Sequence, residues 1–201
     1  MITEHDINKA EEFAAQILSG DHSGHDIEHI LRVMNNARRI IELDNIKDID
    51  ENLTLFCCAL HDVDDRKLKP KGEPEYSNLK KFCDMCGYDN GIFTAARDII
   101  DKISFSKNST IDPNLRMEAK VAQDADRLDA LGAVGIARAF SYGGHAGRDM
   151  YGDNSTVSHF YDKLFKLPEL MYTQAGRKLA DERISFMREF IDRLNVESKK
   201  I

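Results

Sequence analysis

The stretch LTLFCCALHDVDD, residues 53–65, determines our prediction of the fold. Seven of the eight residues from Leu53 to Leu60 are apolar, which predicts a helix buried over most of its circumference rather than a surface helix with one polar face. His61 and Asp62 follow this apolar run directly. An imidazole and a carboxylate at the edge of a core are costly unless a metal ion or a hydrogen-bond partner compensates them.

A metal ion at His61 and Asp62 needs ligands from other segments, because two ligands from one turn leave its coordination shell incomplete. Further candidates are His25 and His29 in HSGHDIEHILRV (residues 22–33), and Asp124, Asp126 and Asp129 in QDADRLDALG (residues 123–132). The two histidines lie on one face if their segment is helical. An adjacent His-Asp pair is weak evidence alone, whereas the ordered set of histidines and aspartates is much stronger.

This ordered set resembles the HD superfamily of metal-dependent phosphohydrolases. The family pattern has a histidine on one helix, a His-Asp pair ending another and a later aspartate in an ADRL-like sequence, and the matching residues are His29, His61, Asp62 and Asp126. The resemblance extends from about residue 22 to about residue 150, with further similarity in IIDKISF (99–105), GAVGIARAF (132–140) and the pair Gly143-Gly144. It looks closest to small single-domain bacterial HD hydrolases, some of which cleave nucleoside triphosphates.

The resemblance implies an all-α, single-domain HD-type helical bundle. We expect one domain over residues 1–201, with the motif core at about 22–150 and C-terminal helices at 155–195 packed on it. Apolar periodicity predicts further helices over 4–18, 25–43, 75–87, 90–103, a segment starting near Pro113, 156–166 (bounded by Pro168) and 172–195. The Gly-rich segment from Ser141 to Ser155 is predicted to be a loop, either a lid over the site or an ordinary linker.

Composition restricts the class of protein. A net charge of −7 argues against a general nucleic-acid binder, and an acidic protein that handles phosphate needs a local cation such as a metal ion. We expect a cytoplasmic protein with no membrane contact, because no segment is typical of a signal peptide or a membrane span. The four cysteines are interpreted as reduced thiols, including the Cys83–Cys86 CxxC, since a zinc site would need a second pair.

The resemblance assigns metal binding to His29, His61, Asp62 and Asp126. Two imidazoles and two carboxylates suit one divalent ion, with Mn as the first choice and Fe, Co, Ni or Zn as alternatives. Mg is a weaker alternative because it prefers more oxygen ligands.

The other expected site residues surround these ligands. HD families commonly place an acid three residues after the His-Asp pair, so Asp65 is expected to position or deprotonate the attacking water. Arg32 and Lys67 are expected to stabilise charge that develops in the transition state. The expected substrate-binding residues are His25, Ser104, Asp129 and Arg148. Asp129 either contacts substrate or orients a metal ligand, while Asp124 is equally consistent with a solvated carboxylate.

The leading hypothesis is hydrolysis of nucleoside triphosphates to monophosphate and pyrophosphate. The alternatives are a 5′-nucleotidase or an alarmone hydrolase, although alarmone hydrolases usually carry a Glu-Asp pair where this chain has Asp65-Arg66. A metal-stabilised nucleotide sensor without turnover is the alternative from another class, and a di-iron oxygenase would need additional histidine ligands. The expected partner is a small-molecule nucleotide, not a nucleic acid. The last helix is expected to pack either on the core or on a second subunit, and in the second case the protein would be a homodimer.

Overall fold

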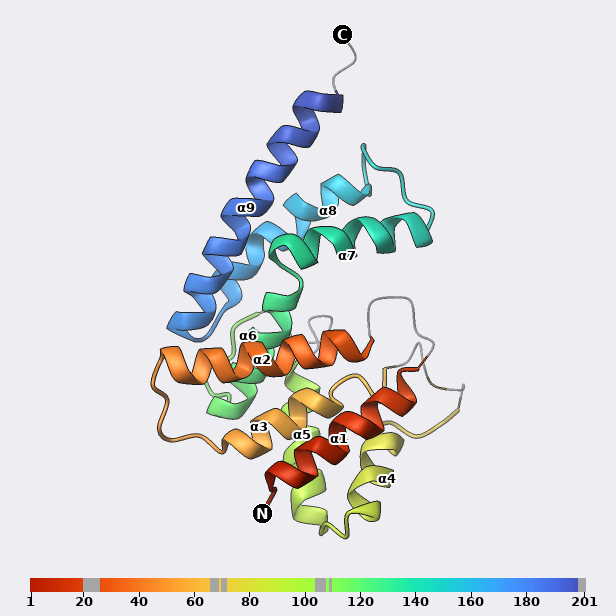
Figure 1. Ribbon diagram of the computed structural model, residues 1–201, viewed down its shortest axis with the longest axis vertical. Helices are drawn as coiled ribbons and strands as arrows, with labels where there is room; N and C mark the ends of the chain where they lie inside the picture. The colour runs from red at the N-terminus through yellow and green to blue at the C-terminus, as the bar shows by residue number, and fades with distance from the viewer. Residues whose placement is uncertain (20–25, 66–68, 70–71, 104–107, 109, 199–201) are drawn as a thin grey trace.

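The structure is a computed structural model that describes residues 1–201 except 20–25, 66–68, 70–71, 104–107, 109 and 199–201. Every regular element within this described part is a helix (Figure 1), which confirms the all-α, single-domain prediction. The elements are α1 (Glu4–Ile17), α2 (Ile27–Leu43), α3 (Glu51–Leu60), α4 (Ser77–Met85), α5 (Asn90–Ile103), α6 (Met117–Asp129), α7 (Gly132–His145), α8 (Thr156–Asp162), the 3-10 helix η1 (Leu164–Leu170) and α9 (Gln174–Ser198). A membrane-crossing length of apolar residues is found in none of the helices described.

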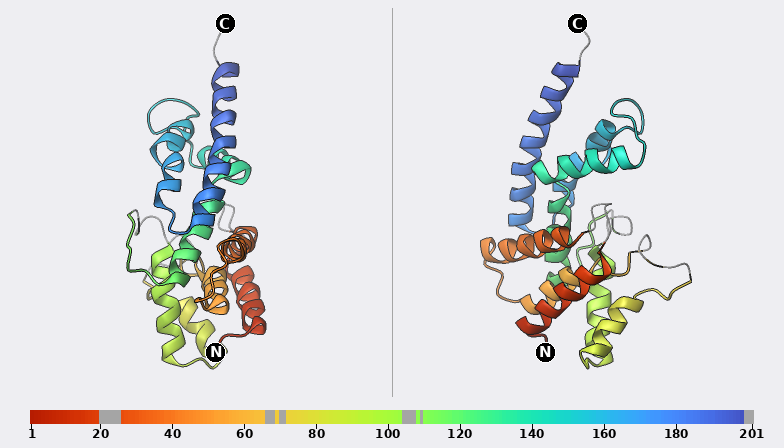
Figure 2. Two further views of the ribbon diagram at one scale, coloured as in Figure 1. Left: turned by 90° about the vertical axis from the view of Figure 1, so that its left-hand side faces the viewer. Right: turned by 45° about the vertical axis from the view of Figure 1, so that its right-hand side comes forward.

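The helices form two groups joined by α6 (Figure 2). In the first group α2 packs against α3 and α6, while α3 also contacts α1 and α5. In the second group α7 and η1 both pack against α9. The N-terminus lies at the end of the first group and the C-terminus at the far end of the second (Figure 1).

Helix α3 is the buried centre of the first group, as its apolar run predicts. Every residue from Leu53 to Leu60 is buried. Asp50 begins the helix by accepting a hydrogen bond from the Leu53 N–H at 2.9 Å, which satisfies one of the first-turn donors that has no partner within the helix. The core around α3 therefore holds the helix in place, and with it His61 at its end.

Two interactions attach α9 to the C-terminal half of α6. The carboxylate of Asp124, which is fully buried, accepts hydrogen bonds from Tyr172 N at 3.0 Å and from Thr173 N at 2.8 Å and Oγ1 at 2.7 Å. A side chain at Gly176 would place its Cβ only 2.6 Å from Asp124 Oδ2, so this position requires glycine. In addition, Arg183 donates to the carbonyl of Leu128. The solvated alternative for Asp124 is therefore wrong.

Replacing Asp124 with alanine is expected to lower the free energy of unfolding by about 2–4 kcal/mol, because the backbone N–H groups of Tyr172 and Thr173, just before α9, lose their buried acceptor. The midpoint of thermal unfolding measures this change. The matched control is Asp181→Ala, which removes an exposed carboxylate from α9 and is expected to leave the midpoint within about 1–2 °C of wild type. An equal midpoint for both variants would contradict the anchoring role of Asp124.

Three predicted helix boundaries are wrong. The helix expected near Pro113 begins at Met117 after a turn. The loop expected from Ser141 starts only after His145, since α7 continues through Gly143. The expected helix 156–166 ends at Asp162, and Pro168 lies inside the 3-10 helix that follows.

Candidate metal centre

The predicted metal ligands come from three helices that pack on one another. His29 lies in the first turn of α2, where Asp26 caps the helix by accepting the His29 N–H at 2.8 Å. His61 is the residue at which α3 ends, and Asp62 follows it. Asp126 lies in the last turn of α6. Because α2 packs against both α3 and α6, these side chains from distant parts of the sequence face one point.

The ligand atoms converge closely. His29 Nε2 lies 3.2 Å from His61 Nε2 and 3.4 Å from both Asp62 Oδ2 and Asp126 Oδ1. His61 Nε2 lies 3.4 Å from Asp62 Oδ2 and 3.7 Å from Asp126 Oδ1. Ligands placed about 2.1 Å from one ion at tetrahedral angles would be roughly 3.4 Å apart. His29, His61 and Asp126, whose ligand atoms all lie within 4.8 Å of one another, therefore fit a single divalent ion, and Asp62 lies against both histidines.

Hydrogen bonds on the opposite side of each ring orient the two histidines. His29 Nδ1 lies 2.7 Å from Asp129 Oδ2, and His61 Nδ1 lies 2.8 Å from the carbonyl oxygen of Cys58. Both partners are acceptors, so in the metal-binding form, in which each ring is neutral, the proton lies on Nδ1. Each Nε2 then directs its lone pair at the common point, which is the arrangement that metal-binding histidines use.

The electrostatics of the cluster also favour a cation. Burial by itself would lower the pKa of His29, but hydrogen bonds to the aspartates outweigh it and raise the pKa to about 11. Burial would likewise raise the pKa of Asp126, but hydrogen bonds from His29 and His61 hold it well below its usual value. The carboxylates thus stabilise positive charge at this point, and a divalent ion supplies that charge.

Asp129 supports His29 and is itself held by arginines. Arg32 donates from Nε to Asp129 Oδ1 at 2.6 Å and from Nη2 to Oδ2 at 3.2 Å, and Arg138 Nη1 donates to Oδ2. Burial would raise the pKa of Asp129, but the hydrogen bonds from His29 and Arg32 lower it to about 2. Asp129 is almost fully buried, so of its two expected roles the contacts favour orientation of a ligand. The sequence reasoning missed Arg138, although it is the one basic residue in the predicted helix GAVGIARAF.

Replacing Asp129 with asparagine is expected to weaken divalent-metal binding by about 10- to 100-fold, the usual effect of losing a partner that orients a metal ligand. The amide keeps the size of the side chain but not its charge. Titration of the metal-stripped protein with Co²⁺, followed by calorimetry, measures this change. An unchanged Co²⁺ affinity would show that Asp129 does not orient His29.

The remaining predicted site residues fall into two groups. His25, Lys67 and Ser104 lie outside the described residues. Asp65 follows Asp62 in a turn closed by the Asp65 N–H, which donates to the Asp62 carbonyl at 3.0 Å. Arg148 lies in the exposed loop after α7, with its guanidinium carbon 5.4 Å from the centre of the Tyr142 ring.

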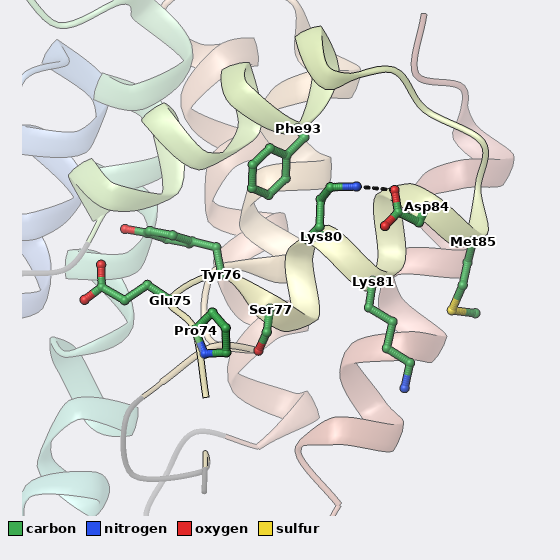
Figure 3. A pocket seen from close by; sticks show the side chains of 9 residues that line it. All are labelled: Pro74, Glu75, Tyr76, Ser77, Lys80, Lys81, Asp84, Met85 and Phe93. Atoms are coloured by element: carbon green, nitrogen blue, oxygen red, sulfur yellow. Dashed lines mark hydrogen bonds and ion pairs between the residues drawn. The ribbon is translucent and has the colours of Figure 1, made fainter. Parts of the chain in front are cut away.

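A surface pocket of about 790 Å³ lies between α4 and α5 (Figure 3). Its wall includes Tyr76, Phe93 and the exposed Met85, and its Lys80 is paired with Asp84. None of the described histidines lines this pocket. The ligand cluster at the end of α3 is therefore the stronger candidate for the active site.

Comparisons with known proteins agree with this geometry. No protein-family model matches the sequence. The chain is 37% identical over 180 residues to the YpgQ protein of Bacillus subtilis. This alignment covers 89% of this chain and 86% of YpgQ. It also matches the crystal structure of an HD-superfamily hydrolase from Bacillus thuringiensis with 35% identity and a TM-score of 0.74, over 96% of this chain and 97% of that one. The protein belongs to the HD superfamily of hydrolases.

A further crystal structure is that of Bacillus subtilis YpgQ in complex with ADP. It matches this HD-superfamily chain with 34% identity and a TM-score of 0.81, over 98% of this chain and 97% of that one. HD hydrolases use divalent metals, and His29, His61 and Asp126 form a group among the described residues that could hold one.

Proposed function

We propose that this protein is a metal-dependent phosphohydrolase that cleaves nucleoside triphosphates to monophosphate and pyrophosphate. The observation that carries the proposal is the convergence of two imidazole Nε2 atoms with two carboxylates, each of which lies 3.4 to 3.7 Å from both nitrogens. The ADP bound to YpgQ supports a small-molecule nucleotide as the ligand. The net charge of −7 gives no support to nucleic acid as a substrate.

His29, His61, Asp62 and Asp126 would hold the ion, for which Mn is our first choice among Mn, Fe, Co, Ni, Zn and Mg. When bound, a divalent ion supplies Lewis acidity toward a phosphoryl oxygen and lowers the pKa of its water. Asp65 is proposed to orient the attacking water and to accept its proton. Lys67 and Arg148 are proposed to neutralise charge on the phosphates, while Arg32 holds Asp129 in place.

Products distinguish this proposal from its alternatives. Metal-stripped protein is resupplied with Mn, Co, Ni, Zn or Mg and incubated with nucleoside mono-, di- and triphosphates or with guanosine tetraphosphate, and the products are separated by chromatography. Pyrophosphate from triphosphates is the expected result. Orthophosphate from monophosphates would instead identify a 5′-nucleotidase, and pyrophosphate from guanosine tetraphosphate an alarmone hydrolase. An absence of turnover with every metal would leave a nucleotide sensor as the better hypothesis.

A further inference from the structure

Arg32 and Arg138 contact the carboxylate of Asp129 in different ways. Arg32 uses two nitrogens, with Nε 2.6 Å from Oδ1 and Nη2 3.2 Å from Oδ2. This side-on geometry is the strong mode of carboxylate recognition by a guanidinium. Arg138 contacts the carboxylate through Nη1 at Oδ2, the oxygen that already accepts from His29 and Arg32. Asp129 therefore has donors on both oxygens without Arg138.

Arg138 also lies close to another donor. Its Nη1 is 3.1 Å from His29 Nδ1. In the tautomer that directs Nε2 at the ion, His29 Nδ1 carries a proton, so the two N–H groups compete for the same oxygen rather than bonding to each other. Removing Arg138 from Asp129 consequently costs the site less than removing Arg32 would.

The position of Arg138 suits a bound anion. The residue belongs to α7, and 27% of its side chain is exposed although its partner Asp129 is almost fully buried. It lies beside the ring of His29, whose other nitrogen faces the metal ligands. A guanidinium carries its donors in a planar fork that matches two oxygens of a phosphate. The protein thus holds a partly exposed cation beside the ring of a proposed metal ligand.

We propose that Arg138 is a substrate-binding residue for the phosphate chain, exchanging Asp129 for non-bridging oxygens of a di- or triphosphate when the ligand binds. The ligand class is a polyphosphate anion, and the inference rests on the proposed phosphohydrolase site. Arg32 remains on Asp129 as a positioning residue. The two arginines of one carboxylate thus have different functions, and their substitutions should have different effects.

The test measures anion and metal affinities separately. Co²⁺-loaded wild-type protein and the variants Arg138→Gln, Arg138→Lys and Arg32→Gln are titrated with imidodiphosphate by calorimetry, with cobalt content measured before and after. The control is Arg193→Gln, an exposed arginine of α9 that pairs with Glu197. We expect Arg138→Gln to weaken imidodiphosphate binding by about 10- to 100-fold. Its Co²⁺ affinity should stay within about twofold of wild type, and Arg138→Lys should recover part of the anion binding because it keeps the charge but loses the fork.

Several outcomes would overturn the inference. One is a loss of Co²⁺ affinity in Arg138→Gln as large as that in Arg32→Gln, which would make Arg138 a second positioning residue. Others are wild-type anion affinity in Arg138→Gln, or no imidodiphosphate binding by the wild type. If Arg138→Gln unfolds, Arg138→Lys decides the question by its anion affinity at normal cobalt content. Anion binding that depends on Arg138 in a protein that hydrolyses no nucleotide would support this inference while contradicting the proposed function.

Discussion

Replacing Asp126 with alanine is expected to abolish hydrolysis and to weaken divalent-metal binding by roughly 100- to 1,000-fold. A structural zinc site with four ligands has a binding free energy of roughly 10–16 kcal/mol, and an equal share for each ligand corresponds to this loss of affinity. Asp126 faces both histidines, at 3.4 Å from His29 Nε2 and 3.7 Å from His61 Nε2, so its loss opens one side of the coordination shell. Calorimetric titration with Co²⁺ and elemental analysis of the purified variant measure the effect.

Two controls accompany Asp126→Ala. Asp62→Ala removes the other carboxylate of the ligand set and is expected to give the same loss, whereas Asp181→Ala on the surface of α9 is expected to bind metal normally. Normal metal content in Asp126→Ala would mean that the ion binds elsewhere. The assignment of the four ligands would then be wrong.

Replacing Asp65 with asparagine is expected to lower kcat by about 100- to 10,000-fold, the usual contribution of a general base. Asparagine has nearly the same size but cannot accept a proton from the attacking water. Because Asp65 is not among the four proposed ligands, the metal content should remain that of the wild type. Steady-state kinetics at saturating metal, with elemental analysis of the same samples, separates lost chemistry from lost metal.

The neighbouring Asp64 provides a matched control for Asp65. Its carboxylate accepts from the backbone N–H groups of Asn78 at 3.1 Å and Leu79 at 2.9 Å, and from Lys69 Nζ at 2.8 Å. Asp64→Asn should therefore lower the midpoint of thermal unfolding, since Asp64 anchors the first turn of α4. Its kcat should stay close to that of the wild type. A kcat within a few-fold of wild type in Asp65→Asn would exclude Asp65 as the base.

The sequence predicted the elements whose signals are local. The bounds predicted for α5, residues 90–103, are those observed, because an apolar face repeats along the whole helix. The burial of α3 and the convergence of His29, His61, Asp62 and Asp126 were also predictable, the first from eight consecutive residues and the second from an ordered motif.

Other features depend on contacts that no local pattern records. Gly143 lies within α7 although glycine has a low helix propensity. The close packing at this position explains the glycine, because a Cβ there would lie 2.1 Å from Thr156 Oγ1. Helix α6 begins at Met117, and the side chain of the preceding Arg116 makes no capping hydrogen bond. The sequence therefore has no helix-start signal at that point. The partners of Asp124 lie nearly fifty residues away along the chain, and Arg138 lies beside His29, which is more than a hundred residues away.

The contacts of helix α6 limit how far this protein can be truncated without loss of function. All four proposed metal ligands precede residue 130, which suggests that a truncated N-terminal fragment would suffice. However, the same turns of α6 carry the buried carboxylate of Asp124 and the carbonyl of Leu128, whose donors belong to residues 172, 173 and 183. A chain ending at residue 130 would keep every ligand and lose the partners that hold the ligand-bearing helix. We therefore expect the smallest functional unit to extend into α9.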